Sequence, residues 1–149
     1  YSAYGPYEDP QRLIPRLIVR GLTGELPPLV DPAVTRDLVY VEDVCDAFLL
    51  AASCTNQEPG AVYNVGSGVQ TTIGEAVALA RRELAIAAEP VWNTLPGRSW
   101  DARTWVADNR KIRQQLGWQP RHSFEQGFRL TRDWLCAHPA LLARYQASS

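Results

Sequence analysis

The sequence predicts a mixed α/β fold, with α/β or α+β as the class, formed as one small lobe. Three short segments rich in β-branched and aromatic residues alternate with helical patterns, so the expected order is strand, helix, strand, helix, strand. These strands are too few and too far apart for a complete doubly wound sheet, and 149 residues suit one domain. We therefore expect a small mixed α/β lobe that packs on a larger partner domain.

The first half of the chain is predicted to begin with a loop, because Tyr-Gly-Pro and Asp-Pro occur within residues 1–10. Residues 11–22 have apolar side chains at helical spacing with arginines opposite them, which indicates an amphipathic helix. Residues 37–44 (DLVYVEDV) are predicted to be a strand, and Asp43 is placed to cap a helix over residues 44–53.

The second half is predicted to contain two further strands and three helices. The strands are residues 61–66 (AVYNVG) and 90–95 (PVWNTL). Thr-x-x-Glu and Ser-x-x-Gln capping boxes predict two of the helix starts, and an aspartate is expected to cap the third. The helices begin at Thr72, Asp108 and Ser123 and run to about Ala88, Gly117 and Ala137.

Composition excludes several classes of function. The formal net charge of -1 gives no electrostatic basis for binding nucleic acid or an anionic membrane, and no apolar run approaches the ~20 residues of a membrane helix. Cys45, Cys54 and Cys136 are odd in number and lack CxxC spacing, so we expect no disulfide framework and a reducing cytoplasm. His122 and His138 have no partner at metal-ligand spacing, so no metal site is expected.

The chain contains no methionine, and it begins abruptly with YSAYGPYEDP. These two features predict that it is the C-terminal part of a longer protein. All but one of its 15 basic residues are arginine, the side chain best suited to bidentate phosphate contacts.

Arg36 and Asp37 form a charged pair directly ahead of an apolar strand. The local pattern favours a surface ion pair worth ~0.5 kcal/mol. The alternative is that Arg36 points into a cleft and binds an anion, while Asp37 holds it in place.

Two other segments also leave alternatives open. Residues 64–68 (NVGSG) favour a plain turn over a phosphate-binding loop, because they lack GxGxxG spacing and the next helix begins several residues later. Residues 98–103 (RSWDAR) fit equally well a solvated loop or a functional loop, since two arginines and an aspartate surround a tryptophan.

Taken in series, the segments YGPYEDPQRLIP, RDLVYVEDV, YNVG, RSWDAR and LGWQP resemble the C-terminal half of extended short-chain dehydrogenase/reductases that act on nucleotide sugars. The resemblance covers nearly the whole chain, and nucleoside-diphosphate-glucose 4,6-dehydratases and UDP-sugar 4-epimerases are the nearest groups. It implies that residues 1–149 are the substrate-binding portion of an NAD(P)-dependent nucleotide-sugar epimerase/dehydratase. The Rossmann and catalytic half would then lie upstream.

The resemblance also implies roles for particular residues. Tyr4 of the YGP turn would border the cofactor, and the two arginines at 36 and 98 would bind the substrate diphosphate. The remaining matched positions would line the nucleoside pocket or support the second diphosphate arginine. The full set implied for the substrate is Arg12, Leu13, Pro28, Leu29, Val30, Arg36, Arg98 and Asp101.

The chain departs from the family pattern at several points. Ser99-Trp100 replaces the Pro-Gly of an RPGD motif, and Ser2 stands where asparagine is often found. Neither the glycine-rich Rossmann fingerprint nor the Tyr-x-x-x-Lys pair is present. NAD or NADP would therefore be bound mainly by the N-terminal part, this chain alone would be inactive, and the full-length protein is expected to be a homodimer.

Three functional hypotheses remain open at this point. The first is the substrate-binding portion of a dehydratase, an epimerase or a nucleotide-sugar 4-ketoreductase. The second is a stand-alone, non-catalytic nucleotide-sugar-binding module. The third is an interaction domain that keeps the fold without the site.

Overall fold

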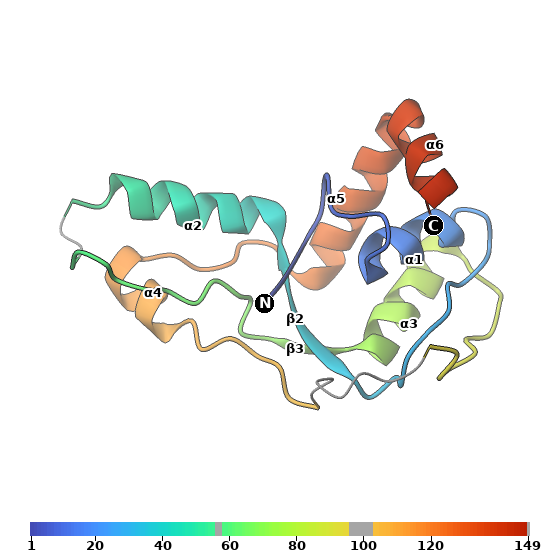
Figure 1. The fold of residues 1–149 in the computed structure, drawn as a ribbon, viewed down its shortest axis with the longest axis horizontal. Coiled ribbons are helices and arrows are strands. Elements are labelled where there is room, and N and C mark those ends of the chain that lie inside the picture. The colour runs from blue at the N-terminus through green and yellow to red at the C-terminus, as the bar shows by residue number, and fades with distance from the viewer. Residues whose placement is uncertain (56–57, 96–102, 149) are drawn as a thin grey trace.

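The fold combines a small sheet with six helices, in a computed structural model that describes residues 1–55, 58–95 and 103–148. This arrangement confirms the predicted mixed α/β class (Figure 1). In chain order the elements are β1 (Ser2–Tyr4), α1 (Leu13–Gly21), β2 (Thr35–Tyr40), α2 (Val41–Ser53), β3 (Gln70–Thr72), α3 (Ile73–Leu84), α4 (Arg110–Leu116), α5 (Phe124–Ala137) and α6 (Pro139–Ser148).

β2 is the central strand of the sheet, whose order is β1-β2-β3. Its second half, Leu38–Tyr40, pairs in parallel with Ser2–Tyr4. Its first half, Thr35–Asp37, pairs antiparallel with Gln70–Thr72. β2 therefore joins the beginning of the chain to the segment that leads into α3.

Two of the predicted strands are wrong, because residues 61–66 and 90–95 are irregular in the structure. Their side chains have strand propensity, but a strand also needs a partner, and within the described residues no strand pairs with either segment. Conversely, β1 and β3 each have three residues, too few for alternation to be visible in sequence. The predicted strand 37–44 lies earlier, at 35–40, because the chain turns into α2 at Val41.

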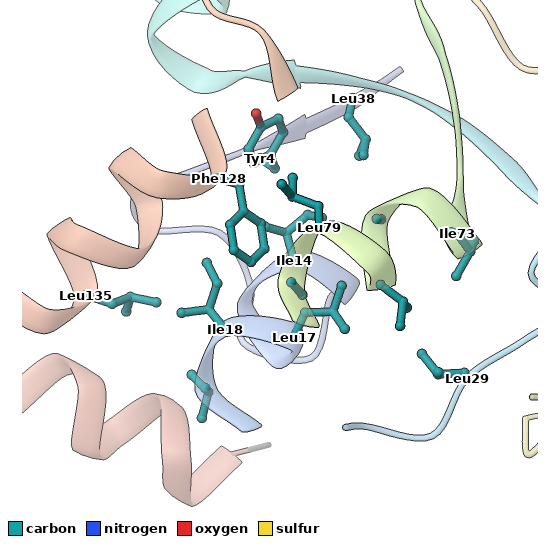
Figure 2. Close-up of a cluster of buried hydrophobic side chains, with 14 of the residues drawn as sticks. Tyr4, Ile14, Leu17, Ile18, Leu29, Leu38, Ile73, Leu79, Phe128 and Leu135 are labelled. Atoms are coloured by element: carbon teal, nitrogen blue, oxygen red, sulfur yellow. The ribbon is translucent and has the colours of Figure 1, made fainter. Parts of the chain in front are cut away.

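The main hydrophobic core lies where α1, α3 and α5 meet beside β1 and β2. Figure 2 shows Leu17, Ile18 and Phe128 within this cluster, and all three side chains are completely buried. Ala76 and Ala80 are also completely buried on α3, and their small side chains let this helix approach its neighbours closely. The helical stripe predicted for residues 11–22 therefore faces the core as expected.

A second cluster joins α2 to α4 and consists of Ala47, Ile112 and Trp118. Figure 1 shows α2 extending away from α1, α3, α5 and α6, with α4 beside it. The Trp118 indole N–H donates to the backbone oxygen of Asp43 over 2.8 Å. This hydrogen bond satisfies the indole in an apolar setting and ties the α4–α5 connection to the start of α2.

Asp43 has a different role from the helix cap predicted for it. It lies in the first turn of α2, whose N-cap residue is Tyr40, and it is 1% exposed. Its carboxylate accepts hydrogen bonds from the backbone N–H groups of Arg121 and His122, at 3.1 and 3.2 Å, and lies 2.9 Å from the His122 Nδ1. Asp43 therefore fixes the approach to α5 through long-range contacts that local spacing does not reveal.

The helix starts predicted from capping boxes are confirmed. The Thr72 hydroxyl accepts from the Glu75 N–H over 3.0 Å, while the Glu75 carboxylate accepts from the Thr72 N–H over 2.7 Å, which lowers the pKa of Glu75. Ser123 and Gln126 form the equivalent pair at α5. α3 ends at Leu84, earlier than predicted, because Ala85 adopts a left-handed conformation; at α4 the N-cap is Asn109 rather than Asp108.

Gly127 lies against the Tyr4 ring, where no room is left for a larger side chain. This lack of room leads to a prediction about stability. A Cβ at this position would stand 2.1 Å from the Tyr4 hydroxyl. Gly127→Ala should therefore lower the free energy of unfolding by about 2–3 kcal/mol, measured by urea denaturation. Gly74→Ala is the control, since its Cβ would meet nothing closer than 3.4 Å.

The variant Tyr4→Phe tests the cause. Alone it should lose about 1 kcal/mol, because the Tyr4 hydroxyl donates to the Phe124 carbonyl over 3.1 Å. Combined with Gly127→Ala it should destabilise by less than the sum of the two changes, since the clashing oxygen is gone. Strict additivity would contradict this account.

Candidate functional site

A cavity of about 600 Å³ lies between the N-terminal part of α1, the extended segment 27–30 and β2. It brings together six of the eight residues predicted to bind substrate, from three separate parts of the chain. These are Arg12, Leu13, Pro28, Leu29, Val30 and Arg36.

The apolar wall of the cavity is held in place by hydrogen bonds of Leu29 with Thr94 and Leu95. The Thr94 hydroxyl accepts from the Leu29 N–H over 2.8 Å, and the Thr94 N–H donates back to the Leu29 carbonyl over 2.9 Å. The Leu95 N–H donates to the same carbonyl over 3.2 Å. Because its backbone is fixed in this way, segment 27–30 presents a rigid apolar surface to the cavity.

Arg36 reaches the cavity because strand side chains alternate between faces. Arg36 and Leu38 both line the cavity, whereas Asp37 between them is turned to the opposite side. Arg36 is half-buried, and its Nη1 donates to the Thr35 carbonyl over 2.7 Å. This contact holds the guanidinium close to the strand.

Asp37 organises a neighbouring turn, which differs from the expectation that it holds Arg36. The carboxylate is completely buried and accepts from the Ser67 N–H and hydroxyl at 2.7 and 2.6 Å. It also accepts from the N–H groups of Gly68 and Ala107, at 3.0 and 2.8 Å. The amides of Ser67 and Gly68 are thus used by a carboxylate of the protein itself, which favours the turn interpretation over a phosphate-binding loop.

Glu8 is the acidic residue of the cavity among the described lining residues. Its side chain is 9% exposed, and its Oε1 lies 2.9 Å from the Arg12 Nε. Its Oε2 and the Nε of Arg16 are buried, and neither has a hydrogen-bond partner in the described part of the chain. Burial raises the pKa of Glu8 to about 7, although the Arg12 charge opposes this increase.

The other predicted site residues lie elsewhere. Tyr4 is 2% exposed, and its hydroxyl donates to Phe124 inside the core, so its predicted place at the cofactor stays a prediction. Arg98 and Asp101 lie outside the described residues.

Glu8, Arg16 and Thr94 are cavity or supporting residues that the sequence analysis missed. One signal was available for Glu8, since opposite charges at positions 8 and 12 have i,i+4 spacing. Thr94 gave no such signal, because it meets Leu29 across 65 positions of the chain.

Comparison with known proteins identifies the family. The family model described as GDP-mannose 4,6 dehydratase matches residues 1–131. The chain belongs to this family. The resemblance to nucleotide-sugar epimerases and dehydratases is therefore confirmed.

Members and structural relatives of the family include both dehydratases and epimerases. A dTDP-glucose 4,6-dehydratase of Xanthomonas campestris pv. campestris (strain B100) is 34% identical over 140 residues, covering 88% of this chain and 39% of the relative. A UDP-glucose 4-epimerase from Thermotoga maritima, solved with UDP-glucose, is 32% identical with a TM-score of 0.79, covering 91% of this chain and 44% of that one. The enzyme WbmF of Bordetella bronchiseptica, solved with NAD+ and UDP, is 28% identical with a TM-score of 0.81, covering 99% and 47%. The chain thus spans less than half the length of these relatives.

Membrane-spanning helices and metal-binding clusters are both absent from the described ranges. None of their helices is both long and apolar enough to cross a membrane. They also contain no cluster of three or more histidine, cysteine or acidic side chains that could hold a metal ion.

The Asp37 contacts lead to a second prediction. Asp37→Asn should lower the free energy of unfolding by about 3 kcal/mol, because an amide donor would then face buried N–H donors. Ser67→Ala removes one of the four donors to Asp37 and the acceptor of the Val69 N–H, and should cost about 1–2 kcal/mol. Equal losses in urea denaturation would contradict the central role of the carboxylate.

Glu8 gives a prediction for pH dependence. Because its pKa is about 7 in the folded chain against an ordinary 4.5, the folded state binds more protons within this window, and stability should fall as pH rises through it. The penalty at pH 8 relative to pH 4.5 should be at most about 3 kcal/mol. Glu8→Gln should flatten this dependence in urea denaturation, whereas Glu25→Gln, in the exposed pair with Arg20, should leave it unchanged. An unchanged slope in Glu8→Gln would contradict the shift.

Proposed function

We propose that this chain is the substrate-binding portion of an NAD(P)-dependent nucleotide-sugar 4,6-dehydratase or epimerase. The observation that carries the proposal is the cavity in which Arg12 and Arg36 lie beside the apolar segment at Leu29 and Val30. A nucleoside diphosphate combines a flat base with two negative charges, so it is complementary to such a wall and to such cations.

Each part of the cavity has a task in this proposal. The base lies against Pro28 and Val30, which flank the buried Leu29, the residue whose backbone is fixed by Thr94. Arg36 donates to the diphosphate, where a planar guanidinium can form two parallel hydrogen bonds. Leu13 lines the nucleoside end, and Arg12 beside it supplies a second cation for the diphosphate. The further diphosphate arginine that we propose, Arg98, with Asp101, belongs to the segment outside the described residues.

The contribution of this chain to catalysis is placement of the sugar. When bound, the nicotinamide cofactor would accept hydride from the sugar C4. Binding the nucleotide, which does not react, holds the sugar in one orientation. Part of the binding energy is thus used to position the reacting carbon. We infer that the cofactor is held mainly by an N-terminal part, because this sequence contains neither the glycine-rich fingerprint nor the Tyr-x-x-x-Lys pair.

The exposed face of α2 supports a proposed contact with such an N-terminal Rossmann part. Phe48 and Leu49 are 72% and 68% exposed on a helix that extends away from the main core (Figure 1). Large apolar side chains clustered on one surface are typical of an interface. Homodimerisation and a cytoplasmic location of the full-length protein stay predictions.

A stand-alone binding module is the second candidate. It is favoured by one observation, namely that the described residues of this chain form the cavity by themselves. A glycine-rich fingerprint and a Tyr-x-x-x-Lys pair encoded upstream would favour the enzyme, and their absence would favour the module.

Titration with UDP-glucose tests binding in either case. Arg36→Ala should weaken binding by ten- to a hundredfold, as expected for the loss of a charge-assisted contact of about 1.5–3 kcal/mol. Arg36→Lys should bind UDP-glucose with an affinity between those of the parent chain and Arg36→Ala, because lysine keeps the charge without the planar donors. Arg20→Ala, outside the cavity, is the control, and an Arg36→Ala variant that binds as tightly as the parent chain would overturn the diphosphate assignment.

A further inference from the structure

Arg12 is already paired with an anion of the protein itself. Its Nε lies 2.9 Å from the Glu8 Oε1, while its side chain remains 54% exposed at the edge of the cavity. The ion pair thus has one buried partner and one accessible partner. A ligand phosphate that approached Arg12 would meet a guanidinium whose charge is partly compensated.

The Glu8 carboxylate has fewer hydrogen-bond partners than its two oxygens can accept. Only one of its carboxylate oxygens has a partner, and the buried Oε2 has none within the described residues. A buried ionised carboxylate with an unused oxygen is costly, and the cost disappears when the group takes up a proton. Arg16 adds a second unsatisfied polar atom to the cavity, because its Nε is buried and has no hydrogen-bond partner among the described residues.

We propose that Glu8 controls the availability of Arg12, acting as an internal anion that a ligand diphosphate displaces while Glu8 takes up a proton. The proposal rests on the proposed function, because it names the diphosphate of a nucleotide sugar as the competing anion. Glu8 is a positioning residue in this scheme. The guanidinium passes from carboxylate to phosphate, and the proton that neutralises Glu8 comes from solvent.

The charges around Glu8 agree with this scheme. Burial favours a proton on Glu8 most strongly, and repulsion by Asp9 adds to this effect, whereas the positive charge of Arg12 and a hydrogen bond with the Gly5 backbone oppose it. The phenols nearby stay neutral, because burial raises the pKa values of both Tyr4 and Tyr145. The groups that face Glu8 or its immediate neighbours are Tyr4 from β1, Tyr7, Asp9 and Arg12 from the following loop, Arg16 from α1, and Arg144 and Tyr145 from α6, where the Tyr145 hydroxyl donates to the Glu8 carbonyl.

The size of the effect follows from the fraction of molecules with neutral Glu8. With a pKa of about 7, roughly nine-tenths of the molecules have neutral Glu8 at pH 6 and roughly one-tenth at pH 8. Apparent affinity scales with this fraction, so the dissociation constant should rise about tenfold between these values. Binding at pH 8 should take up about one proton, and binding at pH 6 almost none.

The test is calorimetric titration of the chain with UDP-glucose at pH 6 and 8, in two buffers of different ionisation enthalpy. UDP-glucose suits the test because its diphosphate is esterified at both ends and lacks the group that titrates near pH 6 in a phosphate monoester. The parent chain should show the tenfold change and the proton uptake. Glu8→Gln should bind with the high affinity at both pH values and take up no proton, whereas Glu25→Gln should behave like the parent.

The outcomes separate this proposal from the proposed function. Binding without a pH slope or proton uptake in the parent chain overturns the role of Glu8 and leaves the proposed function standing. A slope that persists in Glu8→Gln, or weaker binding by Glu8→Gln at pH 6, also overturns it. If UDP-glucose binds at neither pH, both proposals fall.

Discussion

The buried carboxylate of Asp37 is the contact on which the arrangement around the cavity depends. Completely buried and acceptor-only, it receives N–H groups from Ser67, Gly68 and Ala107, and thereby joins β2 to two segments that are far away in sequence. A buried carboxylate without these donors would be strongly unfavourable, so the charge and its partners require one another. This mutual requirement fixes how β2 lies relative to the rest of the lobe.

The position of β2 in turn decides what the cavity contains. Alternation along the strand directs Arg36 and Leu38 into the cavity while Asp37 points away, so one strand supplies both the structural anion and a cation for the ligand. The facing segment at Leu29 pairs with no strand of the described residues and is held by hydrogen bonds with Thr94 and Leu95. The cavity is therefore positioned by polar contacts behind its surface rather than by its own lining.

The carboxylate of Glu8, which lines the cavity, and the carboxylate of Asp37, which lies behind β2, differ in how fully they are hydrogen-bonded. Four donors reach the Asp37 carboxylate, whereas the buried Oε2 of Glu8 has no partner among the described residues. A fully satisfied buried group rigidifies a structure, and a partly satisfied one retains a reason to change its protonation or its partner. The same carboxylate chemistry therefore holds the fold together at Asp37 and, in our proposal, responds to pH and ligand at Glu8.

The sequence alone determined the mixed α/β class, the α1 stripe, the two capping boxes and, through the family resemblance, six residues that the cavity brings together. These features depend on local spacing or on motifs that survive as short runs. Tertiary structure decided the rest: which extended segments became strands, the pairing of Asp43 with His122, and the partners of Asp37. The physical reason is that a strand or a buried charge is defined by its partner, and these partners lie 30 to 79 positions away along the chain.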